Sequence, residues 1–279
     1  MNPLKIGCHI SVAKGLEHAV KRALELGAES FQVFTKNPRG LRPKKVDYDD
    51  AAKGVALMQE HDITLVCHTP YITNLSTPKP DLQEVTIRSI VEDLHIAEAY
   101  GAIGAVVHCG KHVGEGEEYG TNRMIETLDL ILDQYDGPVK LLLENTAGQG
   151  SELGLTVDDL MKIRGAVKHP DKIGFCFDTC HSFAAGQWNL ESFDELVKQM
   201  ENSGYLEQLA AIHFNDSKAP FDSKKDRHEK IGQGEIGSEA LAKFLTCDQF
   251  QHLPVILETP VSDEQEYAEE MVYLRDLRS

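Results

Sequence analysis

The sequence lacks any long hydrophobic run. Although 41% of its 279 residues are hydrophobic, no stretch approaches the roughly 18 apolar residues that suggest a membrane-spanning helix. The first residues, Met1–Lys5, also lack the basic segment and long apolar core of a secretory signal. These absences argue against a membrane protein and predict a cytoplasmic chain.

Paired cysteine motifs are missing as well. None of the six cysteines is separated from another by two residues, so neither a zinc ribbon nor a thioredoxin-like redox motif is expected. Most of them lie in apolar segments, such as Phe175–Phe177 and Val66–His68. We therefore expect buried, reduced thiols, as in an intracellular protein.

Excess positive charge is absent too, because the formal net charge is −17 at pH 7. Taken alone, this argues against general nucleic-acid binding, which uses a basic surface. Bound metal cations would offset part of the charge, and its distribution matters more than its total. Basic residues gather in two runs, either solvated loops or contacts for an anion: Lys36, Arg39, Arg42, Lys44 and Lys45, then Lys218, Lys224, Lys225, Arg227 and Lys230.

What the sequence does contain is a regular alternation of short apolar runs and longer amphipathic stretches. The apolar runs are candidate strands: Leu4–Ile10, Ser30–Phe34, Thr64–His68, Ala105–His108, Lys140–Glu144, Ile173–Asp178, Leu209–Phe214 and Pro254–Glu258. Helical periodicity is clearest in Gly15–Leu26, Leu82–Tyr100, Val157–Val167 and Ser238–Leu245. Thr156, followed by acidic residues, is typical of a helix start.

Eight strand–helix units without a break in composition predict an α/β fold, a single (β/α)8 TIM barrel spanning residues 1–279 as one domain. An open doubly wound sheet is the competing architecture. The glycine-rich phosphate-binding motif that usually follows its first strand is missing from Gly7–Ser11.

A residue of metal-ligand type closes six successive candidate strands. These residues are His68, His108, Glu144, Asp178, His213 and Glu258. In a barrel they would converge at the C-terminal face, where such enzymes place their chemistry. One such histidine is usually structural, and one carboxylate often caps a helix. Six in succession favour a metal site, because buried carboxylates and imidazoles are costly to gather without cations.

Two further groups extend this set. His181 follows Asp178 by three residues, and Asp226 and His228 share a later loop. Imidazole and carboxylate ligands suit Zn²⁺, with Mn²⁺ or Fe²⁺ as alternatives. The number of candidate ligands exceeds the need of one or two ions and suggests three.

The sequence resembles the endonuclease IV family of apurinic/apyrimidinic endonucleases over essentially its whole length. The resemblance rests on four segments in the family's order: Leu143–Gly150, Asp178–Gly186, His213–Lys218 and Asp226–His228. It implies a monomeric enzyme of base excision repair that acts on double-stranded DNA containing abasic sites. Such an enzyme cuts on the 5′ side of the lesion and leaves a 3′-hydroxyl and a 5′-deoxyribose phosphate.

The resemblance also implies three Zn²⁺ ions and their ligands. The three ligand sets would be His68, His108 and Glu144; Glu144, Asp178, His213 and Glu258; and His181, Asp226 and His228. Catalysis would depend on Glu144, which bridges two ions, and on Glu258, which orients or deprotonates the attacking water.

Two loops resemble the DNA-inserting loops of the family. One supplies Arg39, and the other supplies Tyr71 and Ile72 as wedges that fill the stack left by an extruded nucleotide. The chain departs from the family after His108, where His-Pro-Gly-Ser-His is usual and Lys111 replaces the serine. We expect Lys111 to be exposed, with phosphate contact as the alternative.

Two other functions account for part of the pattern. A metal-dependent sugar isomerase or epimerase on the same barrel would need only Glu144, Asp178, His213 and Glu258. A non-catalytic, zinc-stabilised binding protein would prefer a closed shell rich in cysteine. The additional ligands and the two loops favour the endonuclease.

Overall fold

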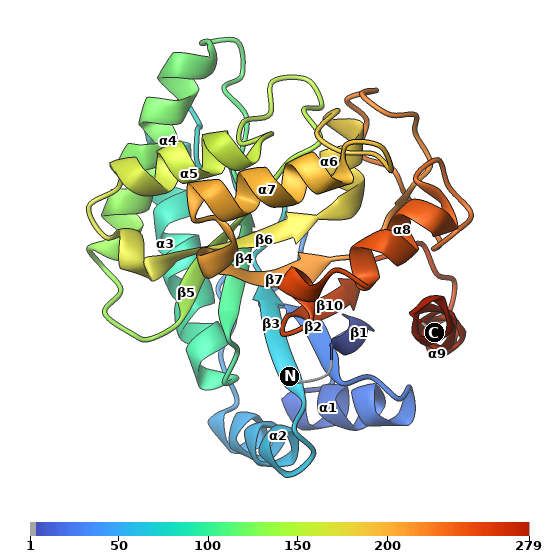
Figure 1. Cartoon of the computed structure of the whole chain (residues 1–279). Coiled ribbons are helices and arrows are strands. Elements are labelled where there is room, and N and C mark those ends of the chain that lie inside the picture. The colour runs from blue at the N-terminus through green and yellow to red at the C-terminus, as the bar shows by residue number, and fades with distance from the viewer. Residues whose placement is uncertain (1–3, 279) are drawn as a thin grey trace.

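The computed structural model describes residues 4–278 and contains a closed barrel of eight parallel strands with helices packed around it (Figure 1). Neighbouring strands follow chain order, and the ring closes where the last strand pairs with the first. The barrel strands are β1 (Lys5–His9), β2 (Ser30–Phe34), β3 (Thr64–His68), β4 (Gly104–His108), β5 (Lys140–Glu144), β6 (Ile173–Asp178), β7 (Leu209–His213) and β10 (Pro254–Leu257). The predicted TIM barrel is confirmed, with each strand within one residue of its predicted ends. Residues 1–3, part of the segment used to predict the absence of a signal, lie outside the described range.

The helices form the outer layer of the barrel. They are α1 (Leu16–Glu25), α2 (Tyr48–Glu60), α3 (Pro80–Ala99), α4 (Glu117–Leu132), α5 (Val157–Ala166), α6 (Thr179–Ala184), α7 (Phe193–Ser203), α8 (Gly237–Leu245) and α9 (Gln265–Leu277), with 3₁₀ turns η1 (Pro170–Lys172), η2 (Leu206–Gln208) and η3 (Asp248–Phe250). Two short strands, β8 (Asp216–Ser217) and β9 (His228–Glu229), pair antiparallel after β7. Across residues 4–278, no helix combines the length and apolar character needed to cross a membrane.

Local sequence explains why these helices form and what they cover. In α1 the buried residues Leu16, Ala19, Val20 and Ala23 lie on one face, as the 3.6-residue period requires. The predicted start of α5 at Thr156 is confirmed by a capping box, in which its hydroxyl and the side chain of the residue three positions later each accept a backbone N–H. The six cysteines are free, and five of them are buried.

The barrel interior is lined by every second residue of each strand. Val66, Val106, Leu142, Cys176 and Ala211 come from five neighbouring strands and form a small apolar cluster of their own. The residues that flank the first four on their strands belong instead to the larger core between strands and helices, as does Ile212 beside Ala211. This alternation, which follows from the period of two in a β-strand, decides which side chains face the inside of the barrel.

The loop that follows β2 is held by a buried lysine. The ammonium group of Lys36, 1% exposed, lies 3.1 Å from Asp93 and 3.0 Å from Glu92, and it donates a hydrogen bond to the carbonyl oxygen of Ser89. Burial raises the pKa of Asp93 to about 6 although Lys36 opposes the shift. Lys36 therefore does not belong to the basic surface run in which the sequence grouped it, because α3 takes up its charge.

We predict that Lys36→Met strongly destabilises the protein, because it leaves a carboxylate buried without its cation. Breaking a buried ion pair from one side lowers the free energy of unfolding by about 3–5 kcal/mol. Urea unfolding of the metal-loaded protein measures the loss. The control is Lys21→Met, which removes a lysine from an exposed pair with Glu17 and should change stability little. Equal, small losses in the two variants would show that Lys36 does not anchor the loop.

Candidate metal centre

The strand alternation continues into the polar residues at the C-terminal ends of the strands. Five predicted ligands each lie two residues beyond a member of the inner apolar cluster, and therefore on the inner face of the barrel. These ligands are His68, His108, Glu144, Asp178 and His213. The sixth, Glu258, lies one residue beyond the end of β10 instead of closing the strand, which corrects its predicted boundary.

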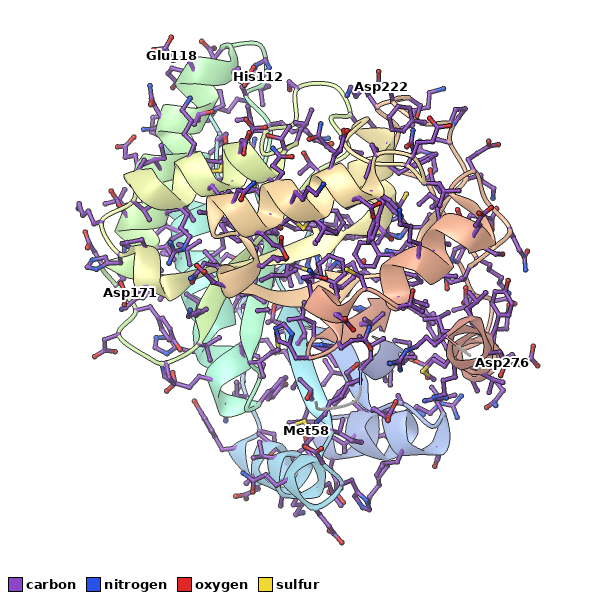
Figure 2. The ribbon with its side chains drawn as sticks, viewed as in Figure 1. Met58, His112, Glu118, Asp171, Asp222 and Asp276 are labelled. Carbon is purple, nitrogen blue, oxygen red and sulfur yellow. The ribbon has the colours of Figure 1, made fainter. Side chains whose placement is uncertain are left out.

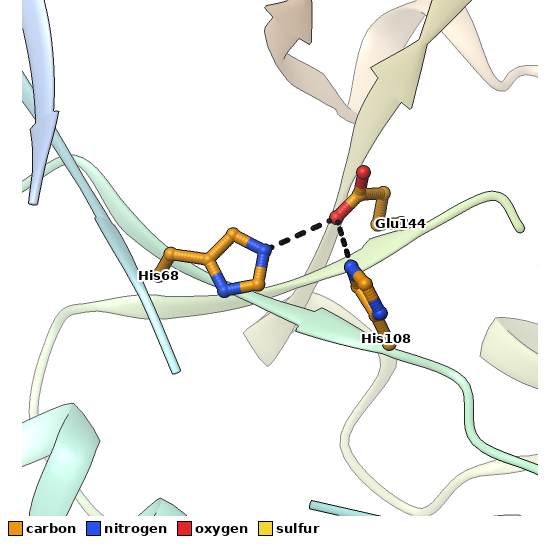
Figure 3. A group of neighbouring side chains, drawn as sticks. All are labelled: His68, His108 and Glu144. Atoms are coloured by element: carbon orange, nitrogen blue, oxygen red, sulfur yellow. Dashed lines mark ion pairs between the residues drawn. The ribbon is translucent and has the colours of Figure 1, made fainter. Parts of the chain in front are cut away.

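The first group of side chains converges on one oxygen of Glu144. Its Oε2 lies 3.4 Å from Nε2 of His68 and 3.2 Å from Nε2 of His108 (Figure 3). His68 donates from Nδ1 to the carbonyl oxygen of Thr69, which leaves the lone pair of Nε2 directed toward the group. Among the described residues, Glu144 Oε2 has no hydrogen-bond partner although it is buried. This arrangement can hold a cation.

The second group shares Glu144 through its other oxygen. Nδ1 of His213 lies 3.0 Å from Glu144 Oε1 and 3.1 Å from Glu258 Oε2. Asp178 completes the group, in which one ligand atom from each residue lies within 4.8 Å of the others. Asp178 is also the N-cap of α6, so its carboxylate is fixed by the fold.

One buried amide orients two members of this second group. The carbonyl oxygen of Gln32 lies 2.7 Å from Nε2 of His213, and its amide nitrogen donates to Glu258 Oε1 at 2.6 Å. A proton on Nε2 leaves Nδ1 of His213 as the ligand atom, and the second bond leaves Glu258 Oε2 free. Gln32 therefore sets both the tautomer of the histidine and the direction of the carboxylate.

The third group lies outside the barrel strands. His181 is in α6 and His228 begins β9, and their Nε2 atoms lie 3.4 Å and 3.5 Å from Asp226 Oδ1. Nδ1 of His228 bonds to the carbonyl oxygen of Glu258, and no described residue hydrogen-bonds its buried Nε2. Asp178 also lies close to both histidines, so the second and third groups adjoin.

The close packing of opposite charges shifts the ionisation of these groups. Burial opposes the charge on Glu144, yet His213 and His108 hold its pKa well below the usual value. Burial disfavours protonated His181, but Asp178 and Asp226 raise its pKa well above the usual value. In the metal-free protein, protonated imidazoles therefore supply the positive charge that the buried carboxylates need.

The predicted DNA-contact residues lie together on two loops. Nε of Arg39 donates to the hydroxyl of Tyr71 at 2.9 Å, and the ring of Tyr71 contacts Phe34 at its edge. Tyr71 and Ile72 are 43% and 44% exposed, which is unusual for such large apolar side chains. The structure thus places the three residues where a partner can reach them.

A cavity of about 560 Å³ opens over the three groups. Its walls include four of the predicted histidine ligands, together with Asp226, Glu258 and Tyr71. Lys111 also lines it, with 49% of its side chain exposed and Glu152 as its ion-pair partner at 3.3 Å. The expectation that Lys111 is exposed is therefore confirmed, and the residue lies at the cavity over the metal groups.

Sequence reasoning missed Gln32 and His9, which also belong to the centre. They pair in register on β1 and β2, and the two side chains are 3.3 Å apart. Each lies two residues beyond a small residue that faces inward, so the strand alternation was the signal that could have identified them. His9 closes β1 but stood one residue before the predicted end of that strand, and Gln32 lies inside β2 and is not a usual metal ligand.

Known proteins resemble this chain in sequence and fold over nearly its whole length. Residues 20–277 match the family model described as xylose isomerase-like TIM barrel. A protein of Symbiobacterium thermophilum described as probable endonuclease 4 is 53% identical, with 98% of this chain and 99% of that protein covered. A protein of Thermotoga maritima with the same description is 36% identical, covering 96% and 94%.

Solved structures include both nucleases and sugar enzymes. Endonuclease IV of Thermus thermophilus superposes with a TM-score of 0.86 at 30% identity, covering 98% of each chain. A D-tagatose 3-epimerase-like protein superposes with a TM-score of 0.71 at 20% identity, covering 98% and 97%. The second likeness concerns the fold alone.

We predict that Gln32→Leu weakens zinc binding by the second group. The loss of one outer hydrogen-bond partner typically lowers metal affinity about 10–100-fold. Competition with a chromophoric chelator measures that affinity. The control is Gln83→Leu, because Gln83 is also buried but bonds to Thr127. It should cost stability without changing zinc affinity, and equal affinities in the two variants would contradict the orienting role.

We also predict that metal uptake by the metal-free protein releases protons. Because the pKa of His181 is raised in the folded protein, protonation of this residue stabilises the metal-free fold fully below pH 6.5. This contribution is lost as the pH rises through the pKa of His181 in the folded state. The lowered pKa of Glu144 acts in the opposite sense. Its ionised carboxylate stabilises the fold above pH 4.5, and this contribution is lost as the pH falls through the pKa of Glu144 in the folded state. Zinc must displace the histidine protons, so affinity should fall from pH 8 to pH 6. Calorimetry in buffers of different ionisation enthalpy measures the release, and buffer-independent heats would count against it.

Proposed function

The chain belongs to the endonuclease IV family of DNA-repair enzymes, and we propose that it cuts duplex DNA on the 5′ side of abasic sites with three bound zinc ions. The products would be a 3′-hydroxyl and a 5′-deoxyribose phosphate, which base excision repair uses. The observation that carries this proposal is the third ligand group, in which Asp226 lies 3.4 Å from His181 and 3.5 Å from His228. Through Asp178, which lies close to both histidines, it adjoins two groups that share Glu144.

The chemistry of the three groups fits zinc. Every proposed donor is a nitrogen or oxygen atom, and six of the nine ligands line an open cavity, which is typical of catalytic rather than structural zinc. Glu144 Oε2 and His228 Nε2 have no hydrogen-bond partner within residues 4–278, so both remain available to a cation. The proposed ligand sets are His68, His108 and Glu144; Glu144, Asp178, His213 and Glu258; and His181, Asp226 and His228. Mn²⁺ or Fe²⁺ would suit the same donors.

The side chains divide the work of phosphodiester hydrolysis. Bound zinc ions supply charge neutralisation, activation of water and stabilisation of the leaving oxygen. Glu144 directs one carboxylate oxygen to each of two groups and so fixes their separation. Glu258 has one oxygen held by Gln32, while the other is left to orient the attacking water and accept its proton.

The exposed loops account for recognition of the lesion. An abasic nucleotide has no base pair to break, so extruding it from the helix costs less than extruding an intact one. Tyr71 and Ile72 would enter the space left in the stack, and Arg39 would insert into the duplex at the lesion. The hydrogen bond between Arg39 and Tyr71 would keep the two loops together as one wedge.

A sugar isomerase or epimerase remains the alternative, since it would use the second ligand group on the same barrel. It would leave His181, Asp226 and His228 without a role, and it would have no use for the exposed wedge. We further propose that the chain is one domain that acts as a monomer in the cytoplasm. The continuous ring of strands supports a single domain, and the free cysteines fit a reducing compartment. The monomeric state rests on the family resemblance.

We predict metal-dependent cleavage of a duplex that carries one tetrahydrofuran abasic analogue. This analogue cannot undergo β-elimination, so a product ending in a 3′-hydroxyl must arise by hydrolysis. Removal of metal by a chelator should abolish cleavage, and zinc should restore it. Glu144→Gln should remove turnover, because an amide cannot supply two anionic oxygens. No cut by folded, zinc-loaded protein would favour the sugar enzyme, and near-normal cleavage by the variant would exclude the bridging role.

A further inference from the structure

The cavity over the metal groups is short of positive side chains. Among the described residues that line it, Lys111 is the only lysine or arginine, whereas Glu152, Asp226 and Glu258 contribute carboxylates. A DNA strand that enters this cavity brings one negative charge for each phosphate. Among the side chains that line the cavity, Lys111 is therefore the one that can form the most favourable electrostatic contact with an incoming phosphate.

The backbone of Lys111 is held firmly in place. The side chain of Asn74 accepts from the N–H of Lys111 at 2.9 Å and donates to its carbonyl oxygen at 3.0 Å. The preceding residue, Gly110, has a φ of +93°, and a Cβ there would lie 2.2 Å from the same Asn74 oxygen. Because Asn74 lies three residues after Tyr71, this clamp fixes Lys111 relative to the loop that carries the proposed wedge.

The side chain of Lys111, in contrast, forms a single ion pair with the residues that the structure describes, and breaking that pair costs little free energy. A backbone bridge places Lys111 opposite Glu152, and their charged groups are 3.3 Å apart. Glu152 is already fixed, because its other oxygen accepts from the N–H of Gln149 at 2.8 Å. An ion pair with an exposed lysine contributes little to stability, so a phosphate can replace the carboxylate at low cost.

We propose that Lys111 binds a backbone phosphate of the DNA strand that enters the metal cavity, and that Glu152 holds the lysine in position until the DNA arrives. This inference rests on the proposed function. Lys111 is a binding residue for the ground state and the transition state alike, so it acts on KM and leaves kcat unchanged. Figure 2 shows His112, the next residue, near the top of the molecule in a region well separated from Asp171 and Met58.

The test compares Lys111→Met with the parent protein on the tetrahydrofuran duplex over a range of salt concentrations. We expect KM to rise about tenfold, equivalent to one charged contact of about 1.4 kcal/mol, with kcat little changed. The slope of log binding constant against log salt should fall by about one phosphate contact. Lys111→Arg should restore the slope, and Glu152→Gln should lower KM because the competing charge is gone.

The matched control is Lys168→Met. Lys168 is 60% exposed and pairs with Asp133 at 3.0 Å, and it lies three residues before Asp171, far from His112 in Figure 2. This variant removes the same charge, so it corrects for the change in net charge. If Lys111→Met matches Lys168→Met in KM and salt slope while the parent protein cleaves, the Lys111 proposal is overturned and the proposed function stands. If the zinc-loaded parent does not cleave, both fail.

Discussion

The buried carboxylate of Glu144 is the constraint on which the rest of this structure depends. An ionised carboxylate without solvent costs several kcal/mol unless compensating charge lies close by. Four imidazoles, those of His68, His108, His181 and His213, approach its two oxygens at 3.0–3.4 Å. A closed barrel can supply three of them, because neighbouring parallel strands end at the same mouth, and α6 supplies His181. An open sheet would spread the same residues along an edge and leave Glu144 without compensation on all sides.

Whether a residue of the metal centre could be predicted from the sequence depends on which contacts fix its position. The strands were predictable because parallel barrel strands are buried on both faces and appear as short apolar runs. Five ligands were predictable because each ends an apolar run and lies an even number of residues from the inward-facing side chains of its strand. They are His68, His108, Glu144, Asp178 and His213. Lys36 was not, since its burial depends on Asp93 and Glu92 in a helix distant in the sequence. The role of Gln32 in orienting His213 and Glu258 could not be predicted, because it depends on contacts between residues that are far apart in the sequence.

The division between barrel and loops explains how one fold serves different chemistry. The second ligand group comes from strand ends, which the barrel geometry brings together whatever the loops contain. The third group depends on loop structure, since Asp226 and His228 lie in a segment whose strands β8 and β9 pair with each other and not with the barrel. Buried Asp216 secures this segment by accepting backbone N–H groups from residues 217, 232, 234 and 236. The barrel strands therefore do not depend on this segment for their pairing.

An acidic chain that acts on DNA must confine attraction to the place where the reaction occurs. With a net charge of −17, the surface repels the phosphate backbone over most of its area, and Lys36 adds nothing because α3 neutralises it. In the second basic run, Lys218, Lys224 and Lys230 are paired with carboxylates. Bound metal ions, Lys111 and the Arg39 loop would supply favourable charge at the C-terminal face of the barrel. Undamaged DNA can meet the surface but cannot easily extrude a nucleotide into the cavity. A general surface that does not attract DNA, combined with attraction at the cavity, therefore favours the lesion over the excess of intact sites.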